Sequence, residues 1–264
     1  MKNRIIVSCL TGAAALMALP LMVAPAAAQN SGAAKEVEAA PQPTPRLPDG
    51  KVDFGGKGVW APIWVLDWAN KKYVEHDVDV PFTDWGLKLF KERRANNSKD
   101  DPEGYCLPPG VPRYTGTPYP FKMIQLPDRM VILYEGASHM YRTIYMDGRK
   151  HTPADELNPT WLGESIGHWE GNDTLVVDTV GFNGKTWLDY VGHPSSDQLH
   201  VIEKFRRPDY LTLEYEATIE DPKAYTKPWT TNFRIKFKPG WELLEYVCLE
   251  NNKDLTHLGT THPE

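Results

Sequence analysis

The clearest β-hairpin of the chain lies in residues 158–189, NPTWLGESIGHWEGNDTLVVDTVGFNGKTWLD. Residues 165–169 are expected to form one strand, and the β-branched run 174–180 is expected to form the return strand. Residues 170–173, Glu-Gly-Asn-Asp, predict a tight turn between them, because Gly and Asn tolerate positive φ. The segment also mixes polar side chains with aromatic ones, which is the composition of a ligand pocket.

Further strands are expected on both sides of this hairpin. Their ranges are 121–126, 130–135, 140–146, 198–206, 210–220, 230–237 and 242–250. Within 211–219 apolar residues alternate with polar ones, and this period of two indicates a half-buried strand. About nine or ten strands with short connections predict an all-β, mainly antiparallel meander that closes into a lipocalin-like barrel. A β-sandwich is the alternative fold.

The first part of the domain contains a Gly-x-Trp sequence and the best candidate helix. Gly58-Val59-Trp60 is expected at the start of the first strand, where the Trp would close one end of the barrel. Residues 81–96 follow a helical pattern, with Thr83 or Asp84 as the N-cap and basic residues in the last turn. The barrel is therefore expected to have a short N-terminal extension that includes a helix.

The N-terminus predicts an exported protein. Lys2 and Arg4 precede an apolar run, and Ala26-Ala27-Ala28 fits a signal-peptide cleavage site, so residues 1–28 are interpreted as a signal peptide. Residues 29–50 are rich in Pro and Ala and predict a disordered linker. Residues 51–264 are then a single domain, and no other stretch is apolar enough for stable membrane insertion. We expect a periplasmic or secreted protein, cleaved near Ala28.

Charge and cysteine content narrow the class of protein further. Cleavage would leave 27 basic and 35 acidic residues, a net charge of −8, which argues against a nucleic-acid partner. Cys106 and Cys248 would remain, and an oxidising compartment favours a disulfide between them over two buried thiols. The sequence contains no phosphate-binding glycine loop and no EF-hand loop, so no cofactor is predicted.

Several blocks, among them PRLPDGKVDFGGKGVW, YCLPPGVPR, PTWLGESIGHWEGNDTLVVDTVGFN and EYVCLENN, cover nearly the whole mature chain. In these blocks the chain resembles a family of exported bacterial β-rich proteins of unassigned function. The resemblance implies an exported β-rich domain, and it implies no particular reaction. In that family pattern position 164 is more often His and position 168 more often Arg. Glu164 and His168 therefore imply a changed substrate or activity if these positions contact a ligand.

Histidines and carboxylates form the first set of candidate site residues. An imidazole with a carboxylate partner can accept or deliver a proton near neutral pH. His193 and His200 are candidate bases, and Asp189 is a nearby orienting group. His168 and Asp178 complete the set of candidate catalytic residues. The alternative interpretation is that these residues cap loops and contribute surface polarity.

A metal site is a weaker interpretation of the same region. Its ligands would be His193, His200 and Glu203, with His139 or His168. On a strand, however, residues 200 and 203 point to opposite faces, so both bind one ion only at a bulge or a strand end. No His-Glu-x-x-His motif or close Cys/His spacing occurs. The sequence therefore predicts no metal ligands.

Five aromatic residues, together with Arg142 and Glu203, form the candidate ligand-binding set. Its members are Arg142, Tyr141, Trp161, Trp169, Trp187, Trp229 and Glu203. Trp and Tyr at a barrel mouth would bind flat ligands and Arg142 would orient a polar end, unless these residues only fill the core. The sequence therefore favours an exported barrel that binds a small apolar or aromatic molecule in its cavity. The alternatives are an acid–base lyase, isomerase or hydrolase acting in that cavity, and a structural envelope protein.

Overall fold

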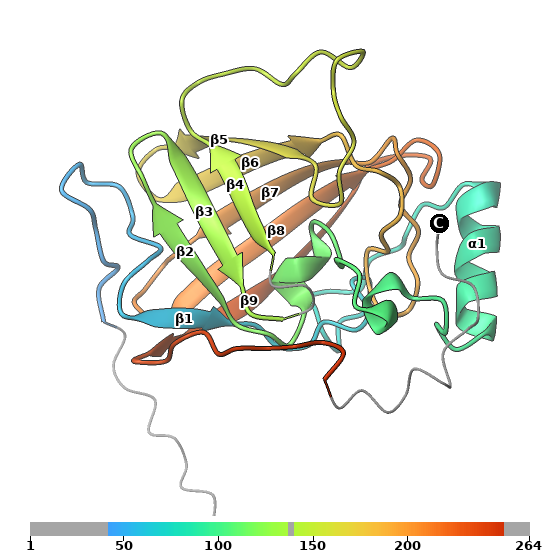
Figure 1. The fold of residues 1–264 in the computed structure, drawn as a ribbon, viewed down its shortest axis with the longest axis horizontal. Helices are drawn as coiled ribbons and strands as arrows, with labels where there is room; N and C mark the ends of the chain where they lie inside the picture. The colour runs from blue at the N-terminus through green and yellow to red at the C-terminus, as the bar shows by residue number, and fades with distance from the viewer. Residues whose placement is uncertain (1–41, 137–139, 251–264) are drawn as a thin grey trace, which may run out of the picture. The chain divides into compact units, whose positions relative to one another are not determined.

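Within residues 42–136 and 140–250, which the computed structural model describes, nine strands form a closed barrel (Figure 1). Each strand pairs with the next along the chain, and β9 pairs back to β1. The strands are β1 Gly58–Ala61, β2 Phe121–Gln125, β3 Arg129–Tyr134, β4 Tyr141–Tyr145, β5 Glu164–Glu170, β6 Thr174–Val180, β7 His200–Arg206, β8 Thr212–Glu220 and β9 Trp229–Pro239. The predicted all-β, mainly antiparallel barrel is confirmed. Closure excludes the sandwich, which has open sheet edges.

The central hairpin has the predicted strands and turn. β5 and β6 pair from Glu164 with Val180 to Glu170 with Thr174, and Gly171 in the turn has φ +63°. Ser165 and Thr179 are buried and face the barrel interior, whereas Glu164 and Asp178 are only partly buried. Neighbouring residues of a strand point to opposite faces, so the hairpin presents one polar set inside and another outside.

One strand pairing departs from a strict meander. β4 and β5 run parallel and pair only Ile144 with Ser165 and Tyr145 with Ile166. Parallel neighbours need a connection that returns the chain to the starting end, and residues 146–163 make this connection. In Figure 1 this loop arches away from the barrel at the top of the view. The seam between β4 and β5 therefore has little backbone pairing to hold it closed.

The barrel interior is occupied mainly by its own side chains. Inward residues form one connected hydrophobic core, which includes Met123, Ile132, Ile144, Val177, Val201, Phe205, Leu213, Ala217, Ile219 and Ile235. Trp60, predicted at one end of the barrel, is fully buried and donates its indole N–H to the Phe54 carbonyl at 2.8 Å. The Arg207 guanidinium lies 4.8 Å from the Trp60 ring. These contacts give the barrel a packed interior rather than an open channel.

Helix α1, Asp84–Ala95, lies between β1 and β2 in the chain and stands beside the barrel in Figure 1. Of the two predicted N-caps, Thr83 is the one observed, and its hydroxyl oxygen accepts a hydrogen bond from the Gly86 N–H at 3.1 Å. A Cβ on Gly86 would lie 2.2 Å from the Ala224 carbonyl oxygen. The helix can pack this closely on residue 224 only because position 86 is glycine.

The predicted disulfide between Cys106 and Cys248 is present. It joins the segment after β9 to the region of two short 3₁₀ helices, Pro102–Tyr105 and Arg113–Gly116. The strand predicted over 242–250 is wrong, because this segment is irregular. β9 already pairs with β8 on one side and β1 on the other, so the barrel offers no free edge to a tenth strand.

Part of the expected linker is bonded to the barrel. The Thr44 hydroxyl donates to the Pro208 carbonyl at 2.7 Å, and Arg46 forms a bridge with Val52. The structure therefore differs from a disordered linker over 42–50, since the Tyr210 backbone N–H also donates to the Gln42 carbonyl at 3.1 Å. The predicted signal peptide and residues 29–41 lie outside the described residues. Among the described residues, no helix has the length and apolar character needed to cross a membrane.

Candidate functional site

A pocket of about 590 Å³ opens at the seam between β4 and β5. Its walls come from β4, from the connecting loop 146–163 and from the first residues of β5. Apolar and aromatic side chains meet polar ones there, among them Met140, Tyr141, Tyr145, Trp161, Leu162, Thr152, Glu164 and Ser165. The volume lies within the roughly 300–1,000 Å³ that small-molecule sites occupy. The short parallel pairing explains the opening, because few backbone hydrogen bonds close this seam.

A buried ion pair lies inside the barrel behind this pocket. The Arg142 and Glu203 side chains are 2% and 0% exposed, and both guanidinium NH2 groups of Arg142 donate to the Glu203 carboxylate. Arg142 Nε also donates to Ser165 Oγ at 2.9 Å, and its Nη2 donates to Thr179 Oγ1 at 2.8 Å. The Tyr215 hydroxyl donates to Glu203 Oε1 at 2.8 Å. Burial alone would lower the pKa of Arg142, but the Glu203 charge outweighs it and raises this pKa above its usual value.

Arg142 was predicted to orient a ligand, and its bonds limit that role. All three guanidinium nitrogens already donate to protein groups. Arg142 contributes to the pocket wall, but a ligand could use its charge only by displacing Glu203, Ser165 or Thr179. The sequence places Arg142 and Glu203 in one ligand-binding set, and the strand register pairs them with each other inside the barrel instead.

A second polar system crosses the outer face of β5, β6, β7 and β8. His151, in the loop, places Nδ1 2.9 Å from Glu164 Oε1 and Nε2 3.1 Å from Asp178 Oδ1. His200 places Nε2 2.9 Å from the same Asp178 oxygen and Nδ1 3.0 Å from Glu220 Oε2. Carboxylates and imidazoles therefore alternate in one continuous chain of five side chains. The chain begins at Glu164, which is part of the pocket wall.

Glu164 also holds the loop against the barrel. It accepts hydrogen bonds from the Thr152 backbone N–H at 2.8 Å and from the Thr152 hydroxyl at 2.6 Å. Burial would raise the pKa of Glu164, but the hydrogen bonds from Thr152 and His151 outweigh it and lower the pKa below its usual value. For loop residues 147–159, all of which are described, the hydrogen bonds to the strands come from His151 and Thr152. These two residues therefore fix the middle of the loop that forms one pocket wall, and backbone hydrogen bonds of Met146 and Thr160 hold its two ends.

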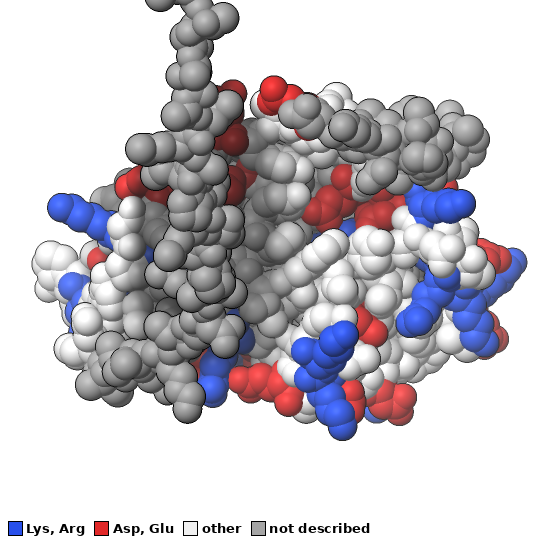
Figure 2. Space-filling model, turned by 90° about the horizontal axis from the view of Figure 1, so that it is seen from below, with Lys and Arg blue, Asp and Glu red and all other residues white. Residues whose placement is uncertain are grey.

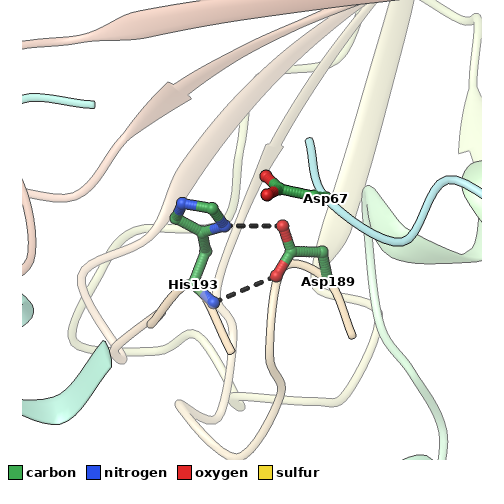
Figure 3. A group of neighbouring side chains, drawn as sticks. All are labelled: Asp67, Asp189 and His193. Atoms are coloured by element: carbon green, nitrogen blue, oxygen red, sulfur yellow. Dashed lines mark hydrogen bonds and ion pairs between the residues drawn. The ribbon is translucent and has the colours of Figure 1, made fainter. Parts of the chain in front are cut away.

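His193 and Asp189 form a separate, buried pair (Figure 3). His193 Nδ1 lies 2.5 Å from Asp189 Oδ2, and the His193 backbone N–H donates to Oδ1 at 3.0 Å. The imidazole stacks against Phe82 and Phe90, with ring centroids 5.6 and 4.5 Å away. Burial would raise the pKa of Asp189, but the charge and hydrogen bond of His193 outweigh it and lower this pKa. Neither residue lines the pocket, so the pair serves to fix its own loop.

Asp67, Asp189 and His193 are the one group, within the described parts of the chain, whose possible metal-ligand atoms all lie within 4.8 Å of one another. Figure 3 shows the Asp67 carboxylate beside this pair. Asp189 already accepts from the backbone N–H groups of Trp68, Gly192 and His193, as well as from the His193 ring. An ion would have to replace these bonds, so the group is better described as a satisfied hydrogen-bond cluster.

The structure does not bring together the metal ligands considered from sequence. His200 lies on the outer face with Asp178, whereas Glu203 points inward to Arg142. His193 is bound to Asp189 elsewhere. His139 lies outside the described residues.

The aromatic candidates are divided among several places. Tyr141 and Trp161 line the pocket. Trp187 is buried under the guanidinium of Arg93 in α1, and Trp229 is buried beside the His193 ring. Trp169 lines a different pocket, of about 380 Å³. Only two of the five aromatic candidates therefore share the site between β4 and β5.

Sequence reasoning missed the residue that links the loop to the barrel, His151. A single His in a polar loop carries no periodic or spacing signal, and its partners on β5 and β6 become visible only after folding. The family resemblance drew attention to Glu164 and His168. Glu164 is part of the pocket wall, whereas His168 is exposed on the outer face of β5 and does not line the pocket.

The fold and this geometry define the class of protein as a closed, mainly antiparallel β-barrel with a pocket in its side wall. Comparison with protein-family models, with curated proteins and with solved structures gives no match for the chain.

Proposed function

We propose that the protein binds a small molecule with an apolar or aromatic body in the pocket between β4 and β5. The observation that carries this proposal is the pocket of about 590 Å³, in which aromatic and aliphatic side chains surround a few polar groups. Ligand sites usually combine these features, since apolar walls supply affinity and polar groups supply orientation. The sequence predicts a site in the barrel cavity, but the barrel interior is packed, so the proposed site lies in the side wall instead.

The lining indicates which polar group the ligand carries. Glu156 and Glu164 contribute carboxylates, and the low pKa of Glu164 keeps it ionised at neutral pH. The positive charge of Arg142 is already neutralised by Glu203. The pocket therefore favours a ligand with a hydrogen-bond donor or a positive charge, placed against the rings of aromatic residues such as Trp161.

The expected setting of this binding protein is the cell envelope or the outside of the cell. The disulfide between Cys106 and Cys248 suits an oxidising compartment, as does the predicted signal peptide. On the face shown in Figure 2, acidic and basic side chains are interspersed over the described residues. With an expected net charge of −8 after cleavage, this surface favours a small-molecule partner over nucleic acid.

An acid–base enzyme acting in the same pocket is the second candidate function. The observation that favours it is the contact of His151 with Glu164 at the pocket wall, since such a pair can transfer a proton. His200 connects to this wall only through Asp178, and His193 is buried elsewhere. The structural envelope alternative predicts a filled barrel without a cavity above roughly 300 Å³. The barrel interior is filled, as this alternative predicts, but a pocket of about 590 Å³ lies in the side wall.

The test is a screen of a broad metabolite panel by melting temperature and Trp fluorescence. A ligand at 100 times its Kd stabilises the folded chain by about 2.7 kcal/mol, or roughly 5–11 °C in a domain of this size. Trp161→Ala should weaken binding of the hit at least about tenfold. The matched control is Trp64→Ala, because Trp64 is 48% exposed and packs on Tyr190 outside the pocket. Equal effects of the two variants, or no active compound, would contradict the proposal.

A further inference from the structure

Four imidazole nitrogens of the outer polar chain face carboxylate oxygens. They are both ring nitrogens of His151 and both of His200, at 2.9 to 3.1 Å from Glu164, Asp178 and Glu220. An ionised carboxylate only accepts hydrogen bonds, and a neutral imidazole has one N–H to donate. With both rings neutral, two of the four contacts would set a nitrogen lone pair against a carboxylate oxygen. Such an arrangement needs either two added protons or a bound cation.

The pattern of the contacts matches that of metal-binding histidines. Nδ1 of His151 can donate to Glu164, and Nδ1 of His200 can donate to Glu220. Both Nε2 lone pairs are then directed at the same oxygen, Asp178 Oδ1. Metal-bound histidines typically donate their other N–H to a carboxylate in this way, which fixes the tautomer and the ring orientation.

We propose that His151, Asp178 and His200 bind a divalent transition-metal ion of the Zn²⁺ class, held by the two Nε2 atoms and the Asp178 carboxylate. Glu164 and Glu220 orient the two imidazoles from behind. Imidazole and carboxylate are borderline and hard ligands that suit Zn²⁺. The carboxylates of Glu164, Asp178 and Glu220 surround the two rings, and their negative charge attracts a cation. The proposal does not depend on ligand binding in the pocket.

The site is accessible and needs a small closure. The side chains of His151, His200 and Asp178 are 25%, 29% and 43% exposed, so an ion can reach them from solvent. The three do not form a set with all ligand atoms within 4.8 Å of one another, so their Nε2 atoms are farther apart than that. Zn–N bonds of roughly 2.0–2.1 Å require these atoms to lie within about 4.2 Å. His151 is on a loop, and rotation of its side chain can close the gap.

Three protein ligands leave a fourth coordination position for water. This is the arrangement of open zinc sites, whereas structural zinc sites usually have four protein ligands. Glu164 is part of the pocket wall and also contacts Nδ1 of His151, so the ion would lie beside the pocket. In the buried group of Asp67, Asp189 and His193, the Asp189 oxygens accept hydrogen bonds from three backbone N–H groups and the His193 ring. No imidazole lone pair has to face a carboxylate oxygen in this pair.

The first test is titration of the full chain, purified without an affinity tag and freed of metal with EDTA, with Zn²⁺ alone at pH 7.5. Calorimetry should show one Zn²⁺ bound per chain. His200→Ala should lower the affinity at least about tenfold, and Glu220→Gln should lower it roughly 10–100-fold. His168→Ala is the matched control, because His168 is exposed on the same face outside the cluster, and its affinity should equal that of the wild type.

The second test uses the unmutated chain, so it does not depend on the folding of a variant. Long-range ¹H–¹⁵N NMR spectra of the histidine rings distinguish neutral, protonated and metal-bound nitrogens. Addition of Zn²⁺ should shift the Nε2 signals of His151 and His200 together. Three results would overturn the proposal: no Zn²⁺ binding, a shift confined to His193, or two doubly protonated rings that Zn²⁺ leaves unchanged at pH 7.5.

Discussion

Replacing Arg142 with Met should destabilise the protein far more than an ordinary substitution of Arg. The change removes the one cation that is bonded to the Glu203 carboxylate among the described residues, and this carboxylate is 0% exposed. Glu203 would keep one hydrogen bond, from the Tyr215 hydroxyl. Removal of one partner of a buried ion pair typically costs about 3–5 kcal/mol, because the remaining charge has no compensation. Arg142→Met should therefore lower the melting temperature by roughly 6–20 °C in a domain of this size.

The double variant Arg142→Met/Glu203→Leu separates this cause from lost packing. Glu203→Leu alone leaves Arg142 unpaired and should also cost about 3–5 kcal/mol. The double variant removes both charges and leaves mainly the Tyr215 hydroxyl without its acceptor, at a cost of about 1–3 kcal/mol. Ser165 and Thr179 can still bond to each other, since their hydroxyl oxygens are 3.2 Å apart. The coupling free energy in the double-mutant cycle should thus be at least about 3 kcal/mol.

Equilibrium unfolding in urea with the disulfide intact measures these free energies. The control is Arg206→Met, which removes the same side chain from an exposed pair with Glu214. Exposed pairs contribute at most about 1 kcal/mol, so this variant should remain close to the wild type. The account would be refuted if Arg142→Met cost no more than Arg206→Met. It would also be refuted if the double variant were as unstable as the sum of the two single variants.

Three further changes test other parts of the structure. Cys106→Ser should lower the free energy of unfolding by up to about 5 kcal/mol in denaturant unfolding, since Cys106 and Cys248 are 142 residues apart. The lowered pKa of Asp189 stabilises the fold above pH about 4, and this stability is lost as the pH falls further. In Asp189→Asn, the free energy of unfolding should therefore depend less on pH in this acid range than in the wild type. Gly86→Ala should lower the melting temperature, because its Cβ would lie 2.2 Å from the Ala224 carbonyl oxygen.

Local chemistry explains what the sequence could predict about the fold. The hairpin of β5 and β6 follows from β-branched residues and a turn glycine, Gly171, with positive φ. The helix start at Thr83 follows from its capping hydroxyl. The tenth strand, over 242–250, failed because its formation depends on a free sheet edge, and closure by β9 and β1 removes every edge. The parallel pairing of β4 and β5 depends on the path of a long loop and carries no local signal.

In the candidate site, too, the sequence identifies single residues but not the contacts between distant segments. Arg142 and Glu203 are candidate ligand contacts in the sequence, but their contact with each other depends on register across three strand pairs. His200 was singled out for its proximity to Asp189 in sequence, and the fold pairs it with Asp178 instead. His151 has no sequence signal at all, although it bonds the loop to two strands. Contacts between distant segments are therefore the part that sequence patterns do not reveal.

A crystal structure of the protein, purified without chelator and soaked with compounds that raise its melting temperature, tests the central claim most directly. The account predicts density for a small organic molecule between β4 and β5, in contact with Tyr141, Trp161 and Glu164. Ordered water alone in this pocket, with the stabilising compound bound at another place, would contradict it.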